Sequence, residues 1–148
     1  MSTHELLYKA IKIATKAHKK QTDKYDAPYL GHVFRVMNAG KTIDEKIVGI
    51  LHDVVEDHPE FSLEYLKGKG FPDYIIEAIE CLTKREEEHL DYDAFIARIE
   101  KSPLAIAVKL NDLRDNMDLT RCTELLHERD LKRFNKYLKA YLYLSEKY

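Results

Sequence analysis

The sequence lacks the features that mark a secreted, disulfide-linked or membrane protein. It has two cysteines, Cys81 and Cys122, which are not paired as CxxC. We therefore expect small buried thiols in a reducing compartment rather than a disulfide or a zinc knuckle. No stretch approaches the roughly 20 apolar residues that span a bilayer, and the first residues lack the apolar run of a signal peptide. The sequence predicts a soluble, cytoplasmic protein without a membrane partner.

Neither sign of charge dominates. The chain has 24 basic and 26 acidic residues, with a formal net charge of −2. It therefore has no basic field that would draw it to DNA or RNA, and nucleic acid is not an expected partner. With 148 residues, 45% of them hydrophobic, and neither repeats nor a linker, the sequence predicts a single domain over residues 1–148.

Strictly alternating apolar runs are missing, whereas helical spacing of apolar residues recurs almost everywhere, so the pattern predicts an all-α fold. A capping box of Ser2 and Glu5 begins the first expected helix, which runs to about residue 20. Further helices are expected at about residues 28–40, 44–57, 63–66, 72–82, 92–100 and 103–117, with a solvated charged loop at 84–91. A last amphipathic helix is expected to use Leu125, Leu126, Phe134, Leu138 and Leu142.

The predicted helix 44–57 has an unusual polar side. Its apolar residues share one arc, and His52, Asp53, Glu56 and Asp57 share the other. The three acids fall in the last turns, where the helix dipole disfavours each negative charge by about 0.3–1 kcal/mol. A nearby cation would remove this conflict. His52 and Asp53 diverge by about 100° around a helix axis, yet a long imidazole and a short carboxylate can still converge on one ion. Other helices would have to complete the cation site.

His32 and Asp112, on the expected helices 28–40 and 103–117, are two further candidate ligands. Two imidazoles and two carboxylates suit a divalent transition metal such as Mn, Fe, Co or Zn. Such an ion would polarise a phosphoryl oxygen and lower the pKa of bound water, so hydrolysis is the expected chemistry. Taken alone, a histidine on an apolar helix is more often a packing residue. Surface or supporting roles are expected for the remaining histidines, which are His4, His18, His58, His89 and His127.

Three ordered motifs connect these candidates to a known family. The segment LHDVVED at residues 51–57 resembles the LHDxxED signature of HD-domain hydrolases related to the RelA/SpoT family and its small stand-alone alarmone hydrolases. Upstream, AHKKQ at 17–21 and APYLGH at 27–32 are similar to that family's AxxxHxxQ…xPYxxH stretch. Downstream, VKLNDLRDN at 108–116 resembles its VKLADxxxN segment. The resemblance extends from about residue 14 to residue 122 and implies a single HD-type helical domain.

The resemblance implies a role for each matching residue. It makes His32, His52, Asp53 and Asp112 the metal ligands, with manganese as the usual ion. It assigns Glu56 and Asp57 to activating or orienting the attacking water. Lys24, Tyr29 and Asn116 are the residues expected to contact a nucleotide substrate. The implied reaction removes the 3′-pyrophosphate of ppGpp and releases GDP and pyrophosphate.

The sequence also departs from that pattern. The loop after the first helix is shortened to residues 22–26, and Lys24 alone stands for the adjacent Arg and Lys of the alarmone hydrolases. Asp26-Ala27 replaces a glycine-containing turn. Lys84, Arg85 and Arg98 are candidate replacement phosphate contacts, although solvated surface is the simpler role for each.

These departures leave two alternatives to the alarmone hydrolase. One is an HD phosphohydrolase that acts on another nucleotide or phosphorylated metabolite, and the other is a helical nucleotide-binding module without turnover. Alarmone synthesis is not expected, because the chain ends soon after the helical domain is complete. The last helix is expected to complete the core, with a homo-oligomer contact as its alternative role.

Overall fold

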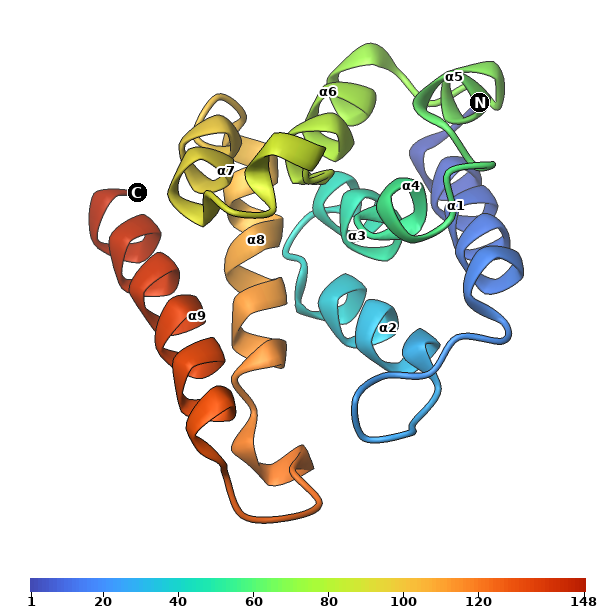
Figure 1. Ribbon diagram of the computed structural model, residues 1–148. Helices are drawn as coiled ribbons and strands as arrows, with labels where there is room; N and C mark the ends of the chain where they lie inside the picture. The colour runs from blue at the N-terminus through green and yellow to red at the C-terminus, as the bar shows by residue number, and fades with distance from the viewer.

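The computed structural model describes residues 1–148 and is all-α (Figure 1). It contains nine α-helices, two short 3-10 helices and no β-strand. The α-helices are α1 (Thr3–His18), α2 (Tyr29–Ala39), α3 (Ile43–Leu51), α4 (Val54–Asp57), α5 (Leu63–Gly68), α6 (Asp73–Leu82), α7 (Tyr92–Ile99), α8 (Pro103–Asn116) and α9 (Glu128–Lys147). The 3-10 helices are η1 (Glu86–Glu88) and η2 (Leu119–Arg121). The predicted fold class is confirmed.

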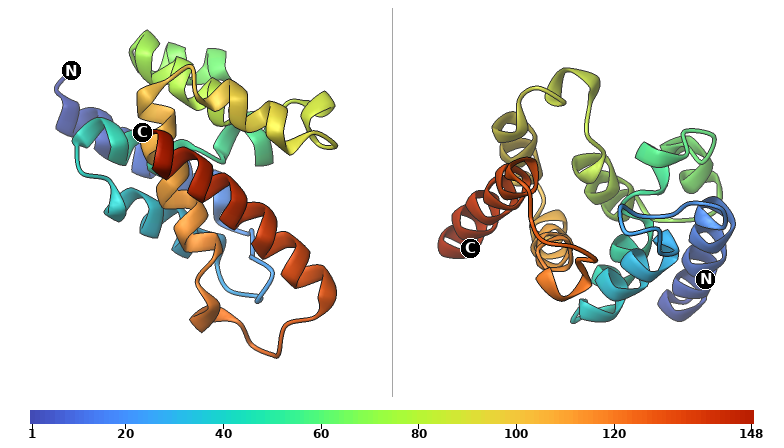
Figure 2. Two further views of the ribbon diagram at one scale, coloured as in Figure 1. Left: turned by 90° about the vertical axis from the view of Figure 1, so that its left-hand side faces the viewer. Right: turned by 60° about the horizontal axis from the view of Figure 1, so that its bottom comes forward.

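Helix α3 lies at the centre of the bundle. It packs against α1 and α2, and also against α6 and α8. Helix α9 packs along α8, at the edge of the molecule opposite α1 (Figures 1 and 2). A core cluster of 28 buried hydrophobic residues extends from Leu6 to Leu144. This arrangement brings the C-terminal end of α3 next to α2 and α8, which carry the other two candidate ligands.

The helix starts follow the capping signals of the sequence. The Ser2 hydroxyl accepts a hydrogen bond from the Glu5 backbone N–H, and the Glu5 carboxylate accepts one from the Ser2 N–H. Pro28 precedes the first residue of α2, and Gly40 follows its last. Ser102 caps α8, with Pro103 in its first turn. The Ser2 and Ser102 hydroxyls satisfy backbone donors that have no partner inside a helix, which is why the local sequence predicts these helix starts well.

The prediction of one continuous helix over residues 44–57 was wrong. The chain leaves helical hydrogen bonding after α3, turns at His52 and Asp53, and resumes as the single turn α4. Asp53 has φ −106° and ψ −2°, in the sparsely populated region between helix and strand. Glu56 and Asp57 consequently lie in the one turn of α4, and not in the last turns of a long helix.

The prediction of a solvated acidic run at 85–88 was also wrong in part. Glu88, in η1, is buried and pairs with the buried guanidinium of Arg98, with 2.7 Å between Oε1 and Nη2. Arg98 also donates hydrogen bonds to the carbonyl oxygens of Glu80 and Thr83. Arg98 therefore ties the 83–88 segment to α6 and α7, and it is not solvated surface as the sequence predicted.

The last helix buries other residues than those expected. Leu125 and Leu126 precede α9 and are exposed, as are Leu138 and Leu142 on it. Ala140 and Leu144 are the residues of α9 that enter the core. The first helix likewise ends at His18, two residues earlier than expected.

Both cysteines are free and half-buried, where the sequence predicted buried thiols. In none of the helices is there a segment with the length and apolar character that a bilayer span requires.

Candidate metal centre

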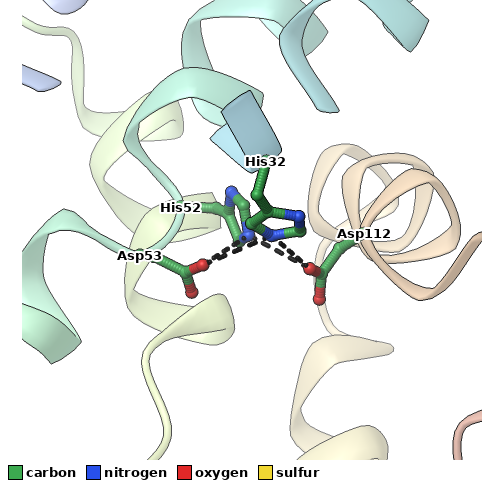
Figure 3. A group of neighbouring side chains, drawn as sticks. All are labelled: His32, His52, Asp53 and Asp112. Atoms are coloured by element: carbon green, nitrogen blue, oxygen red, sulfur yellow. Dashed lines mark hydrogen bonds and ion pairs between the residues drawn. The ribbon is translucent and has the colours of Figure 1, made fainter. Parts of the chain in front are cut away.

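Four side chains from three parts of the chain converge on one point. His32 comes from α2, His52 and Asp53 from the turn between α3 and α4, and Asp112 from α8 (Figure 3). One nitrogen or carboxylate oxygen from each side chain lies within 4.8 Å of all the others. The sequence named these four residues, and the structure brings them together as a group that could hold a metal ion.

The interruption of the helix makes this convergence possible. On a regular helix, His52 and Asp53 would point about 100° apart. In the structure, Nε2 of His52 lies 3.0 Å from Oδ2 of Asp53, because the turn at Asp53 redirects its carboxylate (Figure 3). The same His52 nitrogen lies 3.3 Å from Oδ1 of Asp112. The local break, which the helical pattern did not predict, lets two consecutive residues serve one site.

The His32 imidazole is held from behind by Asp115. Its Nδ1 donates to Oδ2 of Asp115 over 2.6 Å, which fixes the proton on Nδ1 and leaves the lone pair on Nε2. The buried Nε2 lies 3.0 Å from Oδ1 of Asp112 and 3.6 Å from Oδ2 of Asp53, yet makes no hydrogen bond. A nitrogen facing two carboxylate oxygens in this way has the environment of a metal ligand.

His52 is oriented by the backbone. Its Nδ1 lies 2.7 Å from the carbonyl oxygen of Gly49, one turn earlier. A carbonyl can only accept, so Nδ1 carries the proton and Nε2 presents its lone pair to the cluster. Gly49 also marks a close approach of α3 to α2, because a Cβ there would lie 3.2 Å from the backbone of Met37. This close packing sets the spacing between the two imidazoles.

The cluster requires positive charge. Burial lowers the pKa of His52, but Asp53 and Asp112 outweigh burial and raise it to about 10. Burial likewise lowers the pKa of His32, but the neighbouring carboxylates of Asp112, Asp115 and Asp53 outweigh burial and hold this pKa well above its ordinary value. Protons can supply this charge, and so can a divalent cation, which releases them on binding. The donor set of two nitrogens and two carboxylates fits such an ion.

The two carboxylates are supported by further hydrogen bonds. Asp112 accepts from Lys109 Nζ at 2.9 Å and from Asn116 Nδ2 at 3.1 Å. Asp53 accepts from the Tyr29 hydroxyl. Burial alone would raise the pKa of Asp112, but Lys109 and His52 hold it well below its ordinary value. Asn116 and Tyr29, expected to contact substrate, thus also hold the ligand carboxylates.

Glu56 and Asp57 lie beside the cluster in different settings. Glu56 lines the cavity at the cluster, and its Oε1 accepts from the backbone N–H of Lys84 at 2.6 Å. Asp57 is exposed, and its Oδ2 accepts from Gln21 Nε2 at 3.0 Å. The pKa of both carboxyls is raised because neighbouring groups displace part of the water around them, and the negative charge of Asp53 adds to the rise. The raised pKa of each carboxyl group is closer to the pKa that suits a general base near neutral pH.

Lys24 lies away from this cavity. It lines a separate hollow of about 450 Å³ formed with residues 122–133. The shortened loop that carries it turns at Asp26, whose φ of +60° is left-handed and would suit glycine better. The Asp23 carboxylate stabilises the turn by accepting from the backbone N–H groups of Tyr25 and Ala27. The expected contact between Lys24 and substrate stays a prediction.

Several residues of the centre were not identified from the sequence. Lys109 precedes Asp112 by three positions on one helix, a spacing that places both on the same face, so it could have been found. Asp115 lies 83 residues from His32, and no local spacing indicates their contact. The buried His18 was expected only as a surface or supporting residue; its Nδ1 lies 2.7 Å from Gln21 Oε1.

No protein-family model matches this chain. The chain is similar to a protein of Streptomyces coelicolor named GTP pyrophosphokinase, with 27% identity over 157 aligned positions. The match covers 99% of this chain but 18% of the relative, so the chain spans less than a fifth of that protein's length.

Proposed function

We propose that this protein is a divalent-metal-dependent hydrolase that removes the 3′-pyrophosphate of ppGpp. One observation carries the proposal: two imidazole Nε2 atoms and two carboxylate oxygens face one point, with each Nδ1 bound elsewhere. A metal ion in this position would polarise a phosphoryl oxygen and lower the pKa of bound water. Manganese is the proposed ion, because the LHDVVED motif resembles that of the alarmone hydrolases.

The surrounding residues have defined parts in the proposed reaction. Glu56 takes a proton from the attacking water, and Asp57 orients the water or Glu56. The water oxygen forms a bond to the phosphorus attached to the 3′ oxygen, and the bond between that phosphorus and the 3′ oxygen breaks. The proton taken up by Glu56 then passes to the 3′ oxygen. The products are GDP and pyrophosphate. Tyr29 and Asn116 hold Asp53 and Asp112 during this step.

The similarity supports the class of substrate, a guanosine nucleotide, and not the individual compound. The relative's name refers to GTP and to a pyrophosphate group, and both belong to the proposed substrate class. Hydrolysis is favoured over synthesis because the residues gathered here are metal ligands and acids suited to activating water. The proposal concerns this chain's own site and not the activity of the much longer relative.

A second candidate function is favoured by the position of Lys24. This lysine lines a hollow other than the cavity at the metal centre, so the metal chemistry does not depend on it. An HD phosphohydrolase acting on another nucleotide or phosphorylated metabolite would use the same metal chemistry. The two functions differ in the product that is released.

The test is an assay of the purified protein with manganese and ppGpp, in which GDP and pyrophosphate are measured separately. The proposed function predicts equal amounts of both, and no turnover in a Glu56→Gln variant that retains metal. Inorganic phosphate released from other nucleotides, with ppGpp left intact, would support the second function. Absence of hydrolysis across the whole substrate panel would overturn both.

A further inference from the structure

A small cavity opens beside the candidate metal centre. It measures about 130 Å³, which is well below the roughly 300–1,000 Å³ of pockets that enclose a drug-sized ligand. His52, Asp53, Asp112 and Glu56 line one side of it. The other lining residues include three lysines and four residues with phenyl or phenol rings, namely Lys84, Lys109, Lys136, Tyr29, Tyr92, Phe95 and Tyr137. The cavity is thus lined both by the acidic groups of the metal centre and by basic groups, of which Lys109 pairs directly with Asp112.

The three lysines lie at different depths around shared aromatic rings. Lys109 is buried, Lys84 is half-buried and Lys136 is exposed. Their ammonium groups lie 5.8, 5.6 and 4.9 Å, respectively, from the centre of the Tyr92 ring. Because the rings are mainly apolar walls with only a weak attraction for cations, the strongest partner for these ammonium groups would be an anion inside the cavity.

Two of the three lysines form no salt bridge within the chain. Lys109 forms its ion pair with Asp112, whereas neither Lys84 nor Lys136 forms a salt bridge. Partial loss of water around the Lys136 ammonium group lowers its pKa, and the charges of Lys84 and Lys109 lower it further. The convergence of these like charges favours binding of an anion. The Tyr92 hydroxyl is buried without a hydrogen-bond partner, so it offers one more donor.

The distribution of charge identifies the kind of anion. The Asp53 and Asp112 carboxylates would be offset by a divalent ion, which leaves the lysine side positive. One phosphoryl group at the metal would therefore have a second anionic group next to it. The cavity holds a phosphoryl group but not a nucleoside, whose bulk must lie outside.

We propose that Lys84, Lys109 and Lys136 form a subsite for the distal phosphoryl group of a substrate that carries a diphosphate. The proximal phosphoryl group lies at the metal centre, and the distal group takes no part in bond breaking. The subsite selects diphosphate over monophosphate esters, because only the second phosphoryl group gains charge-assisted hydrogen bonds to Lys84 and Lys136. The identity of the substrate rests on the proposed function, but the binding of the anion does not.

Calorimetric titration of the manganese-loaded protein, in excess manganese, tests this subsite with inorganic pyrophosphate and with inorganic phosphate. Pyrophosphate should bind about tenfold more tightly than phosphate, since it gains charge-assisted hydrogen bonds to the lysines. Lys84→Gln and Lys136→Gln should each weaken pyrophosphate binding about fivefold to tenfold and leave phosphate binding unchanged. Lys139→Gln is the matched control, because Lys139 lies on α9 but not in this cavity.

Equal affinity for the two anions, or unchanged pyrophosphate binding in both variants, would overturn the subsite. This outcome can be separated from failure of the proposed function. Lysine-dependent pyrophosphate binding without ppGpp hydrolysis leaves the subsite standing and removes the proposed function. Conversely, ppGpp hydrolysis with an unchanged KM in both variants leaves the function standing and removes the subsite.

Discussion

Gln21 donates a hydrogen bond from its side-chain Nε2 to Oδ2 of Asp57, at 3.0 Å and across 36 residues of sequence. Its amide oxygen lies 2.7 Å from His18 Nδ1 and 2.7 Å from His58 Nε2. Because that oxygen can only accept, both ring nitrogens carry protons. The two histidines therefore fix the direction in which Gln21 presents its amide group to Asp57.

Gln21→Ala should reduce kcat about tenfold while the protein retains its metal, because Asp57 loses the donor that orients it. Kinetics and elemental analysis of the same preparation measure the two effects. Lys20→Ala, at an exposed neighbouring position, is the control and should leave kcat unchanged. Loss of metal from Gln21→Ala would show that the contact maintains the ligand cluster instead of positioning Asp57.

Substitutions at the cluster should separate metal binding from turnover. His52→Ala and Asp53→Ala each remove one of four converging ligand atoms, so metal should be lost on dialysis. Glu56→Gln leaves all four in place and should keep the metal while turnover stops. Elemental analysis after dialysis and an activity assay distinguish these results, and the reverse pattern would contradict the assigned roles.

Gly49→Ala should destabilise the protein by about 1–3 kcal/mol, because the added Cβ would force α3 and α2 apart. That Cβ would lie 3.2 Å from backbone atoms of Val36 and Met37. Since the Gly49 carbonyl also orients His52, the variant should bind metal more weakly. Denaturant unfolding and metal titration measure both changes.

Gly68→Ala is the matched control for this variant. Gly68 lies in α5, and a Cβ there would meet nothing within 4 Å. Alanine also favours helix over glycine by up to about 1 kcal/mol, so stability should be unchanged or higher. If the two alanine variants were equally stable, the close packing of α2 on α3 would not restrict position 49.

The Glu88–Arg98 pair should stabilise the fold in a pH-dependent way. The hydrogen bonds that the Glu88 carboxylate accepts from Arg98 lower the pKa of Glu88 from 4.5 to about 2. Because the folded-state pKa is the lower one, the stabilisation is complete above about pH 4.5 and is lost as the pH falls toward 2.

Glu88→Gln should cost about 1–3 kcal/mol of stability at neutral pH, because the buried Arg98 loses its charged partner. The difference from the natural protein should shrink as the pH falls through this range. Unfolding free energies measured from pH 7 to pH 3 test the trend. Glu87→Gln, at an exposed position of η1, should have no comparable effect, and an equal loss in both variants would contradict a specific role for the buried pair.

The amino-acid sequence by itself determined the fold class, most helix starts and the residue types of the candidate site. Helical periodicity and capping groups such as Ser2 and Ser102 act over a few residues, so their effects can be read locally. Motifs similar to those of a known family indicated His32, His52, Asp53 and Asp112 as ligands before their positions in space were known. Each of these signals lies within a short stretch of chain.

Only the tertiary structure decided how those residues meet. The helix is interrupted at His52 and Asp53 although the local sequence has a good helical pattern. Packing of α3 against α2 and α8, and the hydrogen bond from Tyr29 to Asp53, stabilise this interruption. Burial of Glu88 and exposure of Leu138 depend likewise on which helices become neighbours. Contacts between residues far apart in sequence leave no local periodicity, because their spacing is set by the whole fold.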